Sequence, residues 1–255
     1  MDFIIAAHTD AGIKKEVNQD SVLVEIADTD YGKVCFAVIC DGMGGLSKGE
    51  LASATLVRSF QKWFHDEFPD MLYQGIAPEQ LKDCWEKLIT DGNVRITNYG
   101  IEQKAKLGTT IVALLLVGDI YYITHVGDSR VYRITDTIIQ LTKDQTFVQR
   151  EIDAGRMTPG QAKNDPQRNV LLQCVGASSV VEPEFQFGQT DKDTCFLLCS
   201  DGFRHVISEE EIYTYTNPQV AVSQEAMQER LKYLTDLDKY RRENDNISSV
   251  LVRII

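Results

Sequence analysis

The sequence has little proline and no long apolar run. Only 6 of the 255 residues are proline, and they are scattered, so nothing marks a linker between domains. No wholly apolar run exceeds seven residues, as in 111–117, whereas a membrane-spanning helix needs about 20. Segment 1–8 has no basic region before a long apolar stretch, which argues against a signal peptide. We therefore expect one domain over residues 1–255, located in the cytoplasm, with no membrane partner.

Positive charge is also scarce. Lysine and arginine total 26 against 38 aspartates and glutamates, which gives a formal net charge of −12. Such a surface repels the phosphates of DNA and RNA, so nucleic acid is not an expected partner. The surplus carboxylates suit hard divalent cations, whose ligands are oxygen atoms.

The six cysteines form no Cys-x-x-Cys pair, and five of them lie in apolar segments. Buried thiols in a reducing compartment explain this pattern best, and a disulfide framework is the alternative. The cysteines are Cys35, Cys40, Cys84, Cys174, Cys195 and Cys199.

β-Rich segments fill most of the first 40 residues and return after residue 108. Strands are expected at 20–27, 33–40, 109–117, 120–126, 130–135, 137–141, 184–188, 194–200 and 247–254. Asp28–Gly32 reads as the turn of a hairpin between the first two.

Helical spacing of apolar residues marks the segments between the strand runs. Helices are expected from about 48 to 68, from Pro78 onward, from Ser208 and from near Pro218. Glu211 stands three residues after Ser208, the spacing of a capping box. A polar insertion at 145–180 carries a short helix at 147–154 and a break at 158–160. Strand runs that alternate with helix pairs favour an antiparallel α+β layered fold over a doubly wound one.

Four aspartates stand at the ends of apolar strands: Asp41, Asp128, Asp201 and Asp245. A single Asp-Gly pair is typical of a turn, and Asp91-Gly92, inside a helical pattern, is interpreted in that structural sense. Strands that pair in one sheet would bring the four carboxylates together, and like charges held close require cations. Oxygen ligands without histidine or cysteine favour Mg²⁺ or Mn²⁺ over zinc. Spacing alone leaves turns and a metal site both open.

Six segments resemble, in order, the motifs of the metal-dependent type 2C protein serine/threonine phosphatases, with the bacterial stand-alone branch nearest. They are Thr9–Asp20, Asp41–Gly45, Leu107–Thr110, Gly127–Arg130, Ser200–Phe203 and Asp245-Asn246. Segments 141–144 and 166–170 resemble the flap of that branch. The resemblance implies a four-layer α/β/β/α sandwich, two antiparallel sheets flanked by helix pairs, with 145–180 as an inserted flap.

The resemblance also implies roles for individual residues. Asp41 would bridge two metal ions, the Gly42 carbonyl would add a ligand, and Asp201 and Asp245 would complete the first ion. Asp20 would hold water on the metals, and Gln19 and Asn246 would surround the ligands. Asp128, with Asp201, would hold a third, weaker ion. Lys15 would meet the substrate phosphate.

The reaction implied is direct hydrolysis of phosphoserine or phosphothreonine by water activated between two Mn²⁺ or Mg²⁺ ions. Phosphorylated proteins would be the substrates, a serine/threonine kinase the counterpart, and a monomer the working unit. Two alternatives stay open: a phosphatase of small phosphoesters on the same centre, and a pseudophosphatase that binds phosphoproteins without turnover.

Four positions depart from the family pattern. Lys15 replaces an arginine and so offers a point charge without a bidentate fork; its alternative role is an exposed turn residue. Gln19 replaces a glutamate, and His205 stands where some members carry an acid for the third ion, so weak binding or absence of that ion is expected. Met43 replaces a histidine that eukaryotic members use as a probable acid catalyst, although bacterial members commonly lack it as well.

Overall fold

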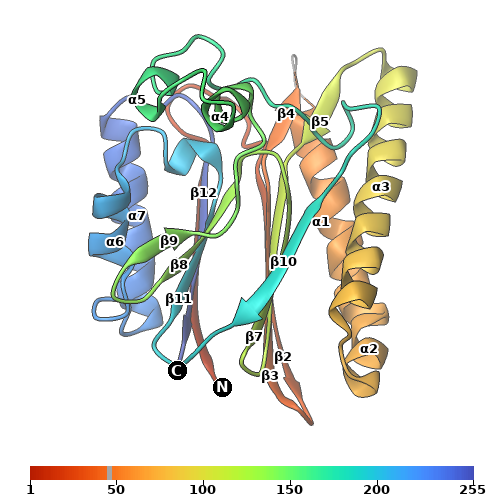
Figure 1. Ribbon diagram of the computed structural model, residues 1–255, viewed down its shortest axis with the longest axis vertical. Coiled ribbons are helices and arrows are strands. Elements are labelled where there is room, and N and C mark those ends of the chain that lie inside the picture. Colours follow the sequence, from red (N-terminus) through yellow and green to blue (C-terminus); the bar gives the residue numbers. More distant parts are fainter. Residues whose placement is uncertain (45–47) are drawn as a thin grey trace.

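In a computed structural model the chain forms two antiparallel sheets packed face to face, with helices on both outer faces (Figure 1). The structure describes residues 1–44 and 48–255. Within them one sheet has the strand order β1-β12-β11-β8-β9 and the other the order β10-β7-β6-β3-β2. The predicted α/β/β/α sandwich is therefore confirmed.

The strands of the two large sheets are β1 (Phe3–Asp10), β2 (Ser21–Thr29), β3 (Gly32–Cys40), β6 (Ile111–Val117), β7 (Ile120–Val126), β8 (Arg130–Ile134), β9 (Ile138–Gln140), β10 (Glu184–Gln189), β11 (Cys195–Cys199) and β12 (Ile247–Ile254). A small ribbon pairs β4 (Gly42–Gly44) with β5 (Leu107–Thr109). The helices are α1 (Gly49–Asp66), α2 (Phe68–Gln74), α3 (Pro78–Gln103), α4 (Phe147–Asp153), α5 (Pro159–Ala162), α6 (Glu209–Thr216) and α7 (Gln224–Tyr240).

The apolar run of β3 is continuous because both of its faces are buried. Phe36, Val38 and Cys40 face the core under α1, α2 and α3. The alternate residues Cys35, Ala37 and Ile39 face the second sheet. A strand covered on both sides loses the polar-apolar alternation of a half-exposed strand. A third core lies between the other sheet and the helices α6 and α7.

The strand directions bring several chain segments to one end of the sandwich. Both β3 and β7 run antiparallel to β6, so their C-terminal ends lie at the same end of the sheet. In the other sheet Cys199, the last residue of β11, lies between Arg130 at the start of β8 and Ser249 near the start of β12. Helices α4 and α5 lie at the end of the molecule opposite the two termini (Figure 1).

Three local expectations were wrong. The helix expected to end near residue 68 stops at Asp66, and the separate helix α2 follows. The helix expected near Pro218 begins at Gln224, because Ser223 caps its N-terminus. The break at 158–160 is the start of α5, where Thr158 and Gln161 form a capping box. Helix α3 continues through Asp91-Gly92 to Gln103, which agrees with the structural interpretation of that pair.

Two other expectations, the capping box and the free cysteines, are confirmed. Ser208 and Glu211 form the predicted capping box at the start of α6. All six cysteines are free thiols, and Cys84 is the one that is only partly buried. Over the described residues, no helix is both long and apolar enough to span a bilayer.

Candidate metal centre

The predicted aspartates come from both sheets rather than from one. Asp41 follows β3 in one sheet, whereas Asp201 follows β11 and Asp245 precedes β12 in the other. Asp128 lies in the link from β7 to β8, where the chain passes between the sheets. The candidate centre therefore lies between the ends of the two sheets, and its aspartates do not share one sheet.

The Leu107–Thr110 motif fixes the backbone of Asp41. The carbonyl oxygen of Asp41 accepts hydrogen bonds from the Thr109 hydroxyl and the Thr110 backbone N–H, both at 2.9 Å. The Asp41 N–H donates to the Thr110 hydroxyl at 3.0 Å. Two adjacent threonines thus hold one residue from both sides, which gives that motif a physical role.

Gly42 lies where two backbones approach it closely. Its N–H donates to the Gln19 carbonyl oxygen at 3.2 Å. A Cβ atom at this position would collide with the carbonyl oxygens of Gln19 and Gly49. The glycine therefore allows Asp41 to stand next to the segment that carries Asp20. Gly45, the last residue of the Asp41–Gly45 motif, lies outside the described residues.

Asn246 holds the opening motif in place. Its side-chain oxygen accepts from the Gln19 N–H at 2.9 Å, and its amide donates to the carbonyls of Ala11 and Val17 at 3.0 and 3.3 Å. Asn246 thus joins β12 to the loop before β2. Gln19 is buried, and its carbonyl oxygen also accepts from the Ser53 hydroxyl at 2.6 Å.

The Asp20 carboxylate is buried, and neither of its oxygens has a hydrogen-bonding partner in the described part of the chain. Oδ1 of Asp201 is likewise buried without a partner there. A buried carboxylate oxygen without a donor is costly. Such oxygens mark the place where a cation would be most stabilising.

Burial and mutual repulsion shift the pKa values of these carboxyl groups. Burial, followed by the charges of Asp20, Asp201, Asp245 and Asp128, raises the pKa of Asp41 well above its usual value. Burial raises the pKa of Asp20 to about 7, and the charges of Asp201 and Asp245 add to this rise. The hydroxyls of Ser248 and Ser200, which lie nearby without meeting hydrogen-bond geometry, oppose it. These carboxyl groups therefore lie close enough to disfavour each other's charge.

Two basic side chains, Lys15 and His205, contact predicted ligands. Nζ of Lys15 lies 3.0 Å from Oδ1 of Asp245, so Lys15 is at the site rather than on a remote turn. His205 lies between two acids, with Nε2 3.3 Å from Asp201 Oδ2 and Nδ1 3.4 Å from Glu243 Oε2. Burial lowers the pKa of His205, but these two carboxylates raise it more.

Two neighbours of the centre were not anticipated from the sequence. Arg204 contacts Asp128, and Glu243 contacts His205 while accepting the N–H groups of Asn244 and Asp245 at 2.7 and 2.9 Å. Arg204 stands directly after the Ser200–Phe203 motif and Glu243 two residues before Asp245. Their position next to a motif was the only feature of the sequence that could have indicated a place at the centre.

The donor chemistry fits one or more hard divalent cations. The candidate ligands are oxygen atoms, and within this cluster three buried carboxylate oxygens, both of Asp20 and Oδ1 of Asp201, have no partner among the described residues. In the same residues no three acidic, histidine or cysteine side chains converge on one ion position. Lys15 and His205 each contact one of the candidate ligands, Asp245 and Asp201 respectively.

The shifted pKa values predict a pH-dependent response to metal. A carboxyl group whose pKa is raised by folding stabilises the folded protein at low pH, and this contribution is lost as the pH rises. For Asp20 the loss falls between its ordinary pKa of 3.8 and about 7. The melting temperature of metal-free protein should therefore fall by several degrees over this range.

Added Mn²⁺ should raise the melting temperature more at about pH 8 than at about pH 5, because the ligands bind metal in their deprotonated form. Thermal unfolding followed across pH, with and without Mn²⁺, measures both effects. Asp20→Asn should flatten the metal-free curve. An equal Mn²⁺ response at the two pH values would contradict the expectation.

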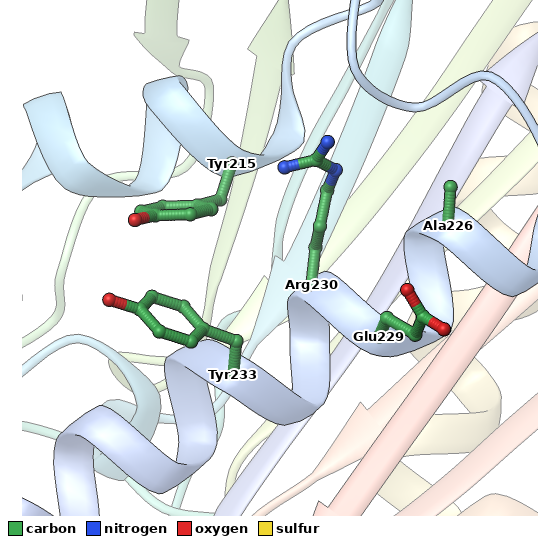
Figure 2. Close-up of a pocket in the computed structure, with 5 residues that line it drawn as sticks. All are labelled: Tyr215, Ala226, Glu229, Arg230 and Tyr233. Atoms are coloured by element: carbon green, nitrogen blue, oxygen red, sulfur yellow. The ribbon is translucent and has the colours of Figure 1, made fainter.

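A cavity of about 330 Å³ lies elsewhere, between α6 and α7 (Figure 2). The rings of Tyr215 and Tyr233 face each other there, with centroids 4.7 Å apart, beside Arg230. Ala226 and Glu229 complete its lining, which includes none of the strand-end aspartates. This cavity is therefore separate from the candidate centre.

Comparison with known proteins agrees with the geometry. Residues 9–236 match the family model described as protein phosphatase 2C. A putative protein phosphatase 2C-type of Streptococcus pyogenes is 31% identical over 251 residues, which cover 97% of this chain and 96% of the relative.

Two solved structures share the fold over their whole length. The serine/threonine phosphatase of S. agalactiae has a TM-score of 0.85 at 27% identity, with 100% of both chains covered. The catalytic domain of the serine/threonine protein phosphatase PstP, in complex with two manganese ions, has a TM-score of 0.79 at 28% identity, again over 100% of both chains.

Proposed function

Because this chain belongs to the protein phosphatase 2C family, we propose that it hydrolyses phosphoserine and phosphothreonine esters of proteins at a binuclear metal centre between its two sheets. The family is metal-dependent, and its named relatives are protein serine/threonine phosphatases. In this proposal residues 1–255 form one catalytic domain, working as a monomer in the cytoplasm, with 145–180 as a flap. A serine/threonine kinase supplies its substrates.

The proposal assigns the metals to the strand-end aspartates. Asp41 would be shared by two ions, the Gly42 carbonyl would add a ligand, and Asp201 and Asp245 would hold the first ion. When bound, the two cations lower the pKa of water and offset charge on the phosphoryl oxygens. Mn²⁺ and Mg²⁺ both suit an oxygen donor set, and the structure with two manganese ions supports Mn²⁺ as the first ion to test.

The chain's own residues have three further tasks. Asp20, buried beside Asp201, accepts hydrogen bonds from water in the centre. Asn246 and Gln19 fix the loop that carries Asp20 and Lys15. Lys15 changes partner, from Asp245 to a substrate phosphate oxygen. Exchange of partner is feasible because the Lys15 side chain is 41% exposed.

One observation carries the proposal: buried Asp20 and Asp201 oxygens without partners lie beside the carboxyl group of Asp41, whose protonation they favour. If these aspartates served only to cap turns, backbone N–H groups would donate hydrogen bonds to these oxygens.

The test compares three substrates at equal Mn²⁺: a phosphothreonine peptide, para-nitrophenyl phosphate and a sugar phosphate. We expect turnover of the first two and preference for the peptide over the sugar phosphate. Preference for the sugar phosphate would favour the small-molecule alternative. Peptide binding without turnover of any substrate would favour the pseudophosphatase.

Lys15→Ala should raise KM for the phosphopeptide and lower kcat/KM roughly 10-fold, in line with the loss of about 1.5 kcal/mol from one charged hydrogen bond at a partly exposed site. Mn²⁺ affinity should rise modestly, since a positive charge beside Asp245 is removed. Lys15→Arg should keep or lower KM, because its fork can take two phosphate oxygens.

Steady-state kinetics at saturating Mn²⁺ measure these changes. The adjacent, exposed Lys14 provides the matched control, and Lys14→Ala should leave kcat/KM unchanged. Unaltered kcat/KM in Lys15→Ala would rule out the phosphate role and leave Lys15 as a partner of Asp245 alone.

A further inference from the structure

The Asp128 side of the centre already contains a buried cation. Nη2 of Arg204 donates to the backbone oxygen of Asp128 at 2.9 Å and to its Oδ2 at 3.2 Å. Both side chains are buried, with 11% of Arg204 and 7% of Asp128 exposed. A divalent ion on the Asp128 carboxylate would therefore lie against a guanidinium that is always protonated.

Arg204 belongs to a row of alternating charges. The same Nη2 lies 3.3 Å from Oδ2 of Asp144. Arg130 holds the Asp144 carboxylate in a fork, with Nε 2.8 Å from Oδ1 and Nη2 2.7 Å from Oδ2. The row Arg130–Asp144–Arg204–Asp128 thus gives each carboxylate a guanidinium partner, and bidentate pairing makes such contacts strong.

The Asp20 carboxylate has no such cationic partner in the part of the chain that the structure describes. Both oxygens of Asp20 and Oδ1 of Asp201 are buried and have no partner in the described residues. Within the described part of this cluster, the buried carboxylate oxygens that lack a donor are therefore those of Asp20 and Oδ1 of Asp201, whereas the Asp128 carboxylate has Arg204 as a partner.

We propose that Arg204 is a built-in cation at the place where the resemblance implies a third metal ion, so that this chain binds two ions and keeps Asp128 out of the metal coordination. The inference rests on the proposed binuclear centre and goes beyond it. It also assigns Arg204 a positioning role.

Arg204 links Asp128 to Asp144, the residue before the 145–180 flap. Gln145, the next residue, is tied to Gly127 in both directions: its N–H donates to the Gly127 oxygen at 3.0 Å and its Oε1 accepts from the Gly127 N–H at 2.8 Å. The base of the flap is thereby fixed to the β7–β8 link without a metal ion.

The test counts Mn²⁺ ions bound to the full chain by equilibrium dialysis up to millimolar Mn²⁺, followed by elemental analysis. The native protein should bind two ions. Asp128→Asn should also bind two, with unchanged affinities, because Asp128 is not a ligand. Arg204→Met, which keeps an unbranched side chain but removes the guanidinium and its charge, should gain a third and weaker ion. Arg156→Met, which removes an exposed arginine paired with Glu151, should still bind two.

Three ions on the native protein, with one lost in Asp128→Asn, would overturn the inference while leaving the proposed function intact. Two ions on a folded Arg204→Met would show that Arg204 does not exclude the third ion, and would also overturn it. No bound ion on the native protein would remove the binuclear centre and this inference together. If Arg204→Met fails to fold, the comparison of native protein with Asp128→Asn still decides.

Discussion

Asp41→Ala should abolish metal binding at the centre and lower kcat/KM for a phosphopeptide by about 1000-fold or more. The expectation follows because one carboxylate is assigned to both ions, and metal-ion polarisation supplies several kcal/mol of transition-state stabilisation, tenfold in rate for each 1.36 kcal/mol. Calorimetric titration with Mn²⁺ and steady-state kinetics measure the two losses.

The metal-free Asp41→Ala protein should be at least as stable as the native protein, because burial and four neighbouring carboxyl groups already disfavour the Asp41 charge. A loss of activity through misfolding is thereby distinguished from loss of the metals. Asp91→Ala removes an exposed carboxyl group within α3 and should change neither Mn²⁺ binding nor kcat/KM. Normal binding of both ions by Asp41→Ala would show that Asp41 is not the bridging ligand.

Gly42→Ala should lower the free energy of unfolding by about 2–3 kcal/mol, the cost typical of forcing an extra carbon into a packed site. The added Cβ would collide with the carbonyl oxygens of Gln19 and Gly49, which are backbone atoms and cannot turn away as a side chain would. Since Asp41 and Asp20 flank this contact in the sequence, Mn²⁺ affinity should fall as well. Urea denaturation with and without Mn²⁺ measures both effects.

Gly160→Ala is the matched control, because nothing lies within 4 Å of a Cβ atom there. Alanine in that short helix should change the free energy of unfolding by less than about 1 kcal/mol. Equal stability of Gly42→Ala and Gly160→Ala would mean that the backbone around Gly42 relaxes easily, and that the glycine is not needed to bring Asp41 near Asp20.

Periodicity predicted most of the layered core, because burial on one or two faces leaves a direct trace in the sequence. The strand β7 has the predicted bounds, and the continuous apolar run of β3 corresponds to burial on both faces. Helix boundaries were harder to predict. Pro218 predicted a helix start, but it lies in a turn in which the side-chain oxygen of Asn217 accepts a hydrogen bond from the Gln219 N–H. Helix α7 begins later, where Ser223 caps its N-terminus.

The positions of the strand-end aspartates followed from the sequence, but their surroundings did not. Which sheet each strand joins depends on pairing between distant segments, so the spacing of Asp41 and Asp201 could not place them in different sheets. The contacts of Arg204 and His205 depend on side-chain direction within one turn after Asp201. Arg204 contacts Asp128 whereas the adjacent His205 contacts Asp201, and the sequence alone does not show which acid each of them meets.

The most direct test of the binuclear centre is the anomalous scattering of a crystal grown with Mn²⁺ and collected near the manganese edge. The account predicts two peaks bounded by Asp20, Asp41, Asp201 and Asp245, with Lys15 released from Asp245, and no peak at Asp128 beside Arg204. No peak among these aspartates, together with phosphopeptide hydrolysis that persists after removal of metal by chelation and dialysis, would contradict it.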